Sequence, residues 1–181
     1  MTASERIKFT DTFTDDVIYL IEAHEAMMKS GEPASFVEPA ACRTFVVLAV
    51  SEIEFLISDL GSSSLLSETL ASYFQERGSN EERVAALANS LQAKGVATDP
   101  TILDDYVALR QIRNVIVHAR QWRNPEYEWI SIRGFPSDLF GFHVGHWERI
   151  QQVRGQMYSY HIQALGMELG KRRRSFESGE R

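Results

Sequence analysis

The chain has 181 residues, of which 44% are hydrophobic and 24% are charged. These ordinary globular values exclude a disordered chain, and the length is enough for one domain with its own core. The apolar runs are too short for a membrane span of about 20 residues. Residues 1–9 carry no apolar signal core, so we expect a cytoplasmic protein. A single cysteine excludes an internal disulfide and a multi-cysteine zinc site.

The net charge of −6 is divided unevenly along the chain. Residues 1–105 carry 7 basic and 18 acidic side chains, whereas residues 106–181 carry 12 basic and 7 acidic ones. The second part therefore has a net charge of +5, which favours it as the location of an anion-binding surface. A functionless scatter of charge explains the same numbers equally well.

Apolar periodicity and helix-terminating residues predict helices through most of the chain. The predicted ranges are 11–30, 36–60, 65–77, 79–94 and 100–122. The second of these is apolar on nearly every side, which predicts a central, buried helix. Ser79 and Glu82 have the spacing of a capping box, and Gly95 ends that helix. Asp99 and Pro100 open the next one, because aspartate caps a helix and proline fits its first position.

One segment differs from the rest. The run Glu126-Tyr-Glu-Trp-Ile-Ser-Ile132 alternates and is aromatic, Gly134 begins a turn, and residues 140–144 supply a return strand. We therefore predict a small β-hairpin-like excursion near 126–144. A last helix over 146–172 completes a mainly α fold, a helical bundle of about five to six helices.

Several side chains with reactive potential are interpreted as packing residues. Cys42 lies in an apolar stretch, which is typical of a small core residue rather than of a reactive thiol. His24 and His161 lie on the apolar stripes of their helices, which predicts packed histidines. His143 and His146 have the spacing of metal ligands without an obvious carboxylate or cysteine companion. We therefore expect no metal and no other cofactor.

The helix predicted over 100–122 carries an arginine that needs an explanation. At about 100° per residue, Arg113 falls inside the arc of apolar side chains. Because a guanidinium keeps its charge, it must be paired or reach an opening. The buried helix over 36–60 offers two carboxylates, Glu52 and Glu54, and we expect Glu54 to be the partner of Arg113.

Asn114 and His118 lie together off the apolar arc, because residues four apart on a helix are neighbours. The sequence Arg113-Asn114-Val-Ile-Val-His118 resembles the Arg-x4-6-His signature of the HEPN superfamily, in which Asn often follows the arginine. Members are small α-helical domains, and many are metal-independent ribonucleases of bacterial defence and toxin–antitoxin systems. Two positions depart from common patterns. Arg120 replaces a tyrosine that is frequent in toxins paired with nucleotidyltransferase antitoxins, and Ala119 replaces a glycine found in some members, so the subfamily stays open.

The resemblance implies that residues 1–172 form a single HEPN-like helical domain, with residues 173–181 as a polar tail that we expect to fray. It also implies that Arg113, Asn114 and His118 are the catalytic residues. In the superfamily, a homodimer places two motifs in one cleft, which would supply both an acid and a base. RNA, a second copy and an antitoxin protein are therefore the expected partners, and no membrane is.

The residue types suit the cleavage of RNA without a metal, in which the 2′-hydroxyl attacks its own phosphorus. His118 would move protons near neutral pH, and Arg113 would bind the phosphate and stabilise the developing charge. Asn114 would orient these two groups, and Glu54 would position Arg113. Losing one member of a buried pair of this kind typically costs about 3–5 kcal/mol.

The surroundings of the motif are basic and aromatic. Residues 106–125 contain no acidic side chain, and the arginines expected to bind RNA there are Arg110, Arg120 and Arg123. Further basic residues that extend this surface are Arg149, Arg154 and the run 171–174. Aromatic side chains suited to stacking on bases are Trp122, Tyr127 and Trp129, although burial in the core or at an interface is the commoner role of such residues.

Two other functions compete with the ribonuclease. The same helical dimer without catalysis would be a module that binds RNA, a nucleotide or a partner protein. A plain dimerisation domain would use Arg113 only as a structural ion-pair member. Binding of nucleic acid without cleavage would identify the binding module. A loss of stability as the only effect of replacing Arg113 would identify the dimerisation domain.

Overall fold

The computed structural model describes residues 3–31, 34–62, 78–118, 124–136 and 138–178. These residues form six α-helices and contain no strand. The helices are α1 (Ala3–Lys29), α2 (Ala34–Ser62), α4 (Asn80–Ala93), α5 (Pro100–His118), α6 (Asn124–Ile132) and α7 (Val144–Ser178). The predicted mainly α bundle is therefore confirmed, and the helix predicted over 65–77 lies outside the described residues.

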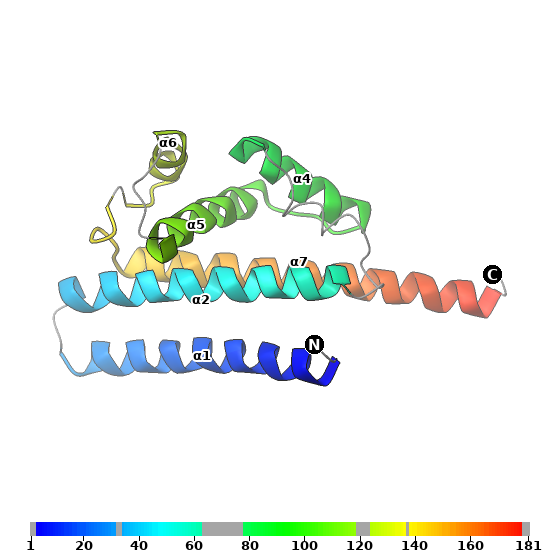
Figure 1. Ribbon diagram of the computed structural model, residues 1–181, viewed down its shortest axis with the longest axis horizontal. Helices are drawn as coiled ribbons and strands as arrows, with labels where there is room; N and C mark the ends of the chain where they lie inside the picture. Colours follow the sequence, from blue (N-terminus) through cyan, green and yellow to red (C-terminus); the bar gives the residue numbers. More distant parts are fainter. Residues whose placement is uncertain (1–2, 32–33, 63–77, 119–123, 137, 179–181) are drawn as a thin grey trace.

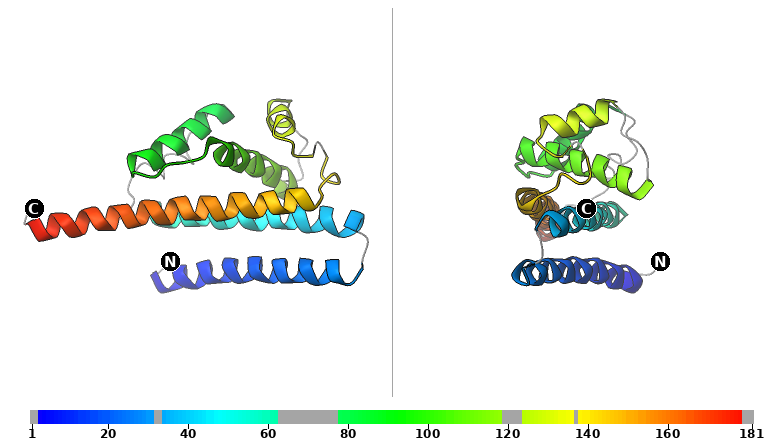
Figure 2. Two further views of the ribbon diagram at one scale, coloured as in Figure 1. Left: turned by 180° about the vertical axis from the view of Figure 1, so that it is seen from behind. Right: turned by 90° about the vertical axis from the view of Figure 1, so that its left-hand side faces the viewer.

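The helices pack in three layers (Figure 1). α2 and α7 run side by side in the middle layer, α1 covers one side of it, and α4, α5 and α6 cover the other (Figure 2). α2 packs against α1, α5 and α7, which is why its sequence is apolar on nearly every side. Its fully buried side chains include Phe45, Val46, Val50, Ile53 and Ile57. The prediction of a central helix is confirmed.

The predicted ends of α4 are also confirmed. The Glu82 amide donates to Ser79 Oγ at 3.2 Å, and the Ser79 amide donates to Glu82 Oε2 at 2.6 Å, so the capping box is complete. Gly95 follows the helix with a φ of 86°, a conformation that side chains with a Cβ rarely adopt. Local sequence signals therefore determine both ends of this helix.

The predicted hairpin near 126–144 is wrong. Residues 124–132 form α6, residues 138–141 form a turn, and residues 141–143 lead into α7 without regular structure. Trp129 and Ile130 are both buried, although they are adjacent in sequence. A strand would place them on opposite faces, whereas a helix separates them by only about 100°, so one helical face can bury both.

α7 is longer than predicted at both ends. It begins at Val144 and continues to Ser178, so the residues expected to form a frayed tail are helical up to that point. In Figure 1 this end of α7 projects beyond the end of α2. The side chains of residues 171–177 are all exposed there.

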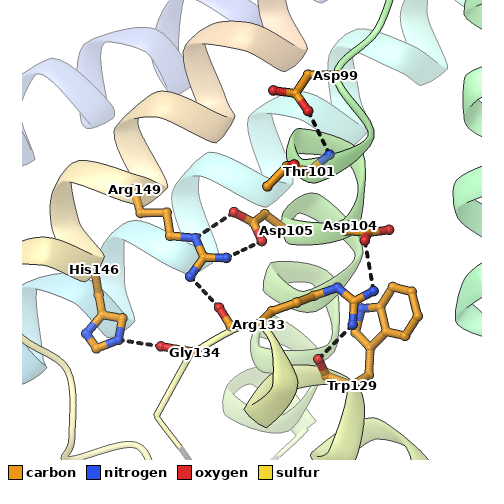
Figure 3. Close-up of polar contacts among 9 residues, drawn as sticks. All are labelled: Asp99, Thr101, Asp104, Asp105, Trp129, Arg133, Gly134, His146 and Arg149. Atoms are coloured by element: carbon orange, nitrogen blue, oxygen red, sulfur yellow. Dashed lines mark hydrogen bonds and ion pairs between the residues drawn. The ribbon is translucent and has the colours of Figure 1, made fainter.

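A polar network fastens α6 and α7 to α5 (Figure 3). The Arg149 guanidinium pairs with both carboxylate oxygens of Asp105, at 2.5 Å for Nε to Oδ2, and also donates to the carbonyl of Arg133. Arg133 in turn pairs with Asp104 at 2.9 Å, and its guanidinium carbon lies 3.1 Å from the centre of the Trp129 ring. The network fixes the turn between α6 and α7 relative to α5.

The side chains interpreted as packing residues are buried, as predicted. Cys42 is fully buried, and burial together with the nearby Glu38 carboxylate raises the pKa of its thiol to about 12. His24 is buried with Nε2 3.1 Å from Glu38 Oε1. His161 is fully buried. Cys42 and His161 are therefore closed to a ligand in solution, whereas His24 lines a cavity of about 200 Å³ between α1 and α2.

Two buried histidines predict a stability that depends on pH. Burial lowers the pKa of His146, as do the neighbouring His143 and Arg149 to a smaller extent, and burial also lowers the pKa of His161. Because both folded-state values lie below the unfolded value of about 6.5, the unfolded chain binds more protons as the pH falls through that value. We therefore expect the free energy of unfolding, measured with denaturant, to fall from about pH 7.5 to about pH 5.5.

His146→Asn is the variant that tests this prediction. The ring of His146 donates from Nε2 to the Gly134 carbonyl and accepts the His143 amide at Nδ1, so the neutral imidazole satisfies both partners. Asparagine retains an acceptor but does not titrate. The variant should show a smaller change in the free energy of unfolding over the same pH range, and an unchanged pH dependence would refute the assignment.

Candidate functional site

α5 carries the motif from Arg113 to His118 at its C-terminal end. The helix begins where predicted: the Thr101 amide donates to Asp99 Oδ1 at 2.8 Å, and Pro100 takes the first position. The rest of α5 packs against α2, α4, α6 and α7. The motif therefore lies on a helix that is fixed on several sides, with its histidine in the last turn.

Glu54 on α2 pairs with Arg113, as predicted, and also with Arg110. Arg113 Nη2 lies 2.6 Å from Glu54 Oε1, and Arg110 Nε lies 2.7 Å from the same oxygen. The exposed fractions of the side chains are 18% for Arg113, 15% for Arg110 and 21% for Glu54. The Arg113 Nε–H group is buried and has no hydrogen-bond partner in the described part of the chain. The pair thus fixes the direction of the Arg113 guanidinium and leaves one donor unsatisfied.

Asn114 and His118 lie on another side of α5. Asn114 is partly buried and His118 is exposed at the end of the helix. Arg113 and His118 are five residues apart, which corresponds to about 140° around the helix axis. Arg113 therefore faces α2 while His118 faces solvent, and among the described contacts of a single copy none joins the two. A phosphate that contacts both Arg113 and His118 of one chain must lie across the end of α5. The alternative is a phosphate that contacts Arg113 of one copy and His118 of a second copy.

A groove lies beside the motif, between α2 and α5. Its volume of about 390 Å³ falls in the range of typical ligand pockets, roughly 300–1,000 Å³. The side chains that line this α2–α5 groove are Ala40, Arg43, Thr44, Val47, Leu48 and Ile116. Because Ile116 belongs to the motif, the groove adjoins the proposed site.

The arginines expected to bind RNA differ in their surroundings. The side chain of Arg110 pairs with Glu54, so it supports the Arg113 pair rather than standing free on the surface. Arg120 and Arg123 lie outside the described residues. An RNA-binding role for these three residues stays a prediction.

The expectation that Arg149 and Arg154 extend a basic surface is wrong. Arg154 binds both oxygens of the buried Glu52 carboxylate, at 2.5 Å and 2.8 Å, and Arg149 binds the buried Asp105. Both charges are therefore compensated, and they join helices to one another. The basic run 171–174 is exposed on α7, at the end of the molecule away from the C-terminal end of α5 (Figure 1).

The aromatic residues near the site also differ from expectation. Trp129 is 8% exposed and covered by Arg133, so it belongs to the core, as the commoner role predicts. Tyr127 is exposed, and Trp122 lies outside the described residues. The sequence interpretation missed Phe140, which is 80% exposed close to the groove residue Arg43. The sequence already singles out Arg43, because it is an arginine in an otherwise apolar helix. Arg113 was singled out for a similar reason, its place on an apolar arc.

The described residues hold neither a metal-binding cluster nor a membrane-spanning helix. No group of three or more His, Cys, Asp or Glu side chains there is arranged to hold a metal ion. The rings of His143 and His146 lie 3.9 Å apart and face the start of α7, where they satisfy backbone amides. None of the described helices combines the length and the apolar character needed to cross a membrane.

Comparisons with known proteins found no family model, curated protein or solved structure that matches the chain. The motif, its geometry and the chemistry of its side chains therefore carry any assignment of function to this chain.

Proposed function

We propose that this chain is a metal-independent endoribonuclease of the HEPN type, acting in bacterial defence or as the toxin of a toxin–antitoxin pair. The observation that carries the proposal is the Arg113–Glu54 pair. Glu54 on α2 holds the partly exposed guanidinium of Arg113 at the start of the Arg-x4-His motif on α5. An arginine so placed is suited to bind a phosphate through charge-assisted hydrogen bonds.

The proposed reaction cleaves the RNA backbone by internal transfer. The 2′-oxygen forms a bond to phosphorus while the bond from phosphorus to the 5′-oxygen breaks, which leaves a 2′,3′-cyclic phosphate and a 5′-hydroxyl. One imidazole takes the proton of the 2′-hydroxyl, and a second gives a proton to the departing 5′-oxygen. Arg113 stabilises the negative charge that develops on the phosphate, and Asn114 orients the phosphate or the histidine.

A homodimer with a shared cleft supports this chemistry better than one copy does. Each chain supplies one motif histidine, whereas the reaction uses an acid and a base. Arg113 and His118 also face directions about 140° apart on α5. A second copy whose motif lies beside the first would provide the second histidine. It would also place a histidine near Arg113, which the same chain does not.

One observation favours the non-catalytic alternatives. Glu54 already accepts from both Arg110 and Arg113, so the pair also works as a structural link between α2 and α5 without any ligand. On that basis the chain would be a dimeric module that binds RNA, a nucleotide or a partner protein, or a plain dimerisation domain.

Incubation of the purified protein with transfer RNA and total RNA in EDTA separates these functions. We expect cleavage that EDTA does not inhibit. RNA that is bound but stays intact supports the binding module. RNA that is neither bound nor cleaved by a folded dimer supports the structural role and contradicts the ribonuclease.

A further inference from the structure

The α2–α5 groove lies on the same side of α2 as the motif's ion pair. Arg43 and Glu54 are eleven residues apart on α2, which is about three turns and roughly 16 Å along the axis, with similar orientation around the helix. Val47 lies between them in the groove and faces the motif residue Ile116. Between the groove and Glu54, Val50 on the same side of α2 is fully buried, so the groove is a separate opening that starts at Val47 and Ile116.

Phe140 lies close to the groove residue Arg43. Its ring is 80% exposed, so the ring is open to a ligand from solution. The Phe140 amide donates to Asp138 Oδ1 at 2.7 Å, which holds the turn. At Gly141 an added Cβ would lie 3.0 Å from Pro136 Cβ, so this close approach favours glycine.

Arg43 connects this turn to the groove. Its Nη1 donates to the Leu139 carbonyl at 2.6 Å, and its guanidinium carbon lies 5.4 Å from the centre of the Phe140 ring. The ring is thus held in place by α2 although one of its faces is open. An exposed aromatic ring, a cation beside it and an apolar groove next to both form a set of groups suited to a flat, anionic ligand.

We propose that Phe140, Arg43 and the α2–α5 groove form a subsite for one unpaired nucleotide of a single-stranded RNA substrate. This inference rests on the proposed ribonuclease function and names its substrate class. Phe140 stacks on an unpaired base, Arg43 binds a phosphate of the backbone, and the apolar floor at Val47 and Ile116 accepts the base or sugar. A base within a duplex already stacks on its neighbours, so this subsite selects single strands.

The carboxylates of Asp138 and Glu38 are engaged in contacts outside the proposed subsite. The Asp138 carboxylate points back to the Phe140 amide, where it is engaged in the turn. On α2, the Glu38 carboxylate is buried and faces His24 rather than the groove. Of the charged side chains that line the groove itself, Arg43 is the one present, so a phosphate there meets a cation.

Binding of labelled single-stranded RNA to a His118→Ala background tests the subsite, because the bound RNA then stays intact. Adding Phe140→Ala should weaken binding by roughly 5- to 150-fold in Kd, the range for one lost base–aromatic stack. Phe140→Trp should retain the affinity. The matched control is Phe176→Ala, since Phe176 is 89% exposed on α7 and lies outside the groove.

The outcomes distinguish the subsite from the function on which it rests. If the parent protein cleaves RNA but Phe140→Ala binds single strands as tightly as the background does, the subsite is wrong and the ribonuclease stands. If Phe176→Ala weakens binding as much as Phe140→Ala, the effect is not specific and the subsite is also wrong. A parent protein that neither binds nor cleaves RNA overturns both proposals.

Discussion

Replacing His118 by alanine is expected to lower RNA cleavage by about 10²–10⁴-fold, the usual contribution of a positioned acid or base. The side chain is exposed at the end of α5, so its loss removes no packing and should leave the melting temperature within about 1–2 °C of the parent. Cleavage of a labelled RNA by the two proteins at equal concentration measures the effect.

His143→Ala is the matched control for this prediction. His143 is also exposed, but it lies at the start of α7, outside the motif. We expect this variant to keep the cleavage rate of the parent. Full activity in His118→Ala, or an equal loss in both variants, would show that the motif histidine is not catalytic.

Replacing Glu54 by alanine should destabilise the fold and also impair cleavage. Two arginines on α5 lose their carboxylate in a site that is largely buried. The cost should be about 2–3 kcal/mol, below the roughly 3–5 kcal/mol of fully buried pairs, because all three side chains retain some exposure. Denaturant unfolding measures the stability. Cleavage per folded molecule should fall as well, because Arg113 loses its fixed direction.

Glu25→Ala provides the comparison for Glu54→Ala. Glu25 pairs with Lys29 at 3.6 Å, and their side chains are 62% and 78% exposed. Exposed pairs of this kind contribute little, so we expect a change below about 0.5 kcal/mol. If Glu54→Ala loses stability but keeps the full cleavage rate per folded molecule, Glu54 does not position a catalytic arginine.

Structural features that depend on a few neighbouring residues were predicted correctly from the sequence. The capping box at Ser79 and Glu82 and the Asp99–Pro100 start of α5 depend on neighbouring side chains and appear as expected. The Arg113–Glu54 pair joins two helices, yet it was predictable, because a charge that cannot be neutralised must find a partner on a facing helix.

The start of α6 shows where the sequence interpretation failed. Asn124-Pro125 opens this helix with the same pattern that opened α5 at Asp99 and Pro100. The strand prediction depends on the alternation of aromatic and polar residues over a short run and does not include this start signal. A short run fits a strand and a helix almost equally well, and the decision came from the burial of Trp129 and Ile130 on one side of the helix.

The extent of the basic surface could not be predicted either. Arg149 and Arg154 lie in a basic part of the chain, but their partners Asp105 and Glu52 come from α5 and α2. Net charge along the sequence does not record such distant pairing. Only the packing of α7 against both α2 and α5 shows that these two arginines stabilise the fold.

The most direct test of the proposed chemistry compares an oligoribonucleotide with the same oligonucleotide carrying 2′-deoxyribose at the cleaved position, both in EDTA. Because the 2′-hydroxyl is the proposed nucleophile, the first should be cut to give a 2′,3′-cyclic phosphate end, and the second should be bound but stay intact. Cleavage of the deoxy-substituted strand, or failure of the folded dimer to cut any RNA, would contradict the account.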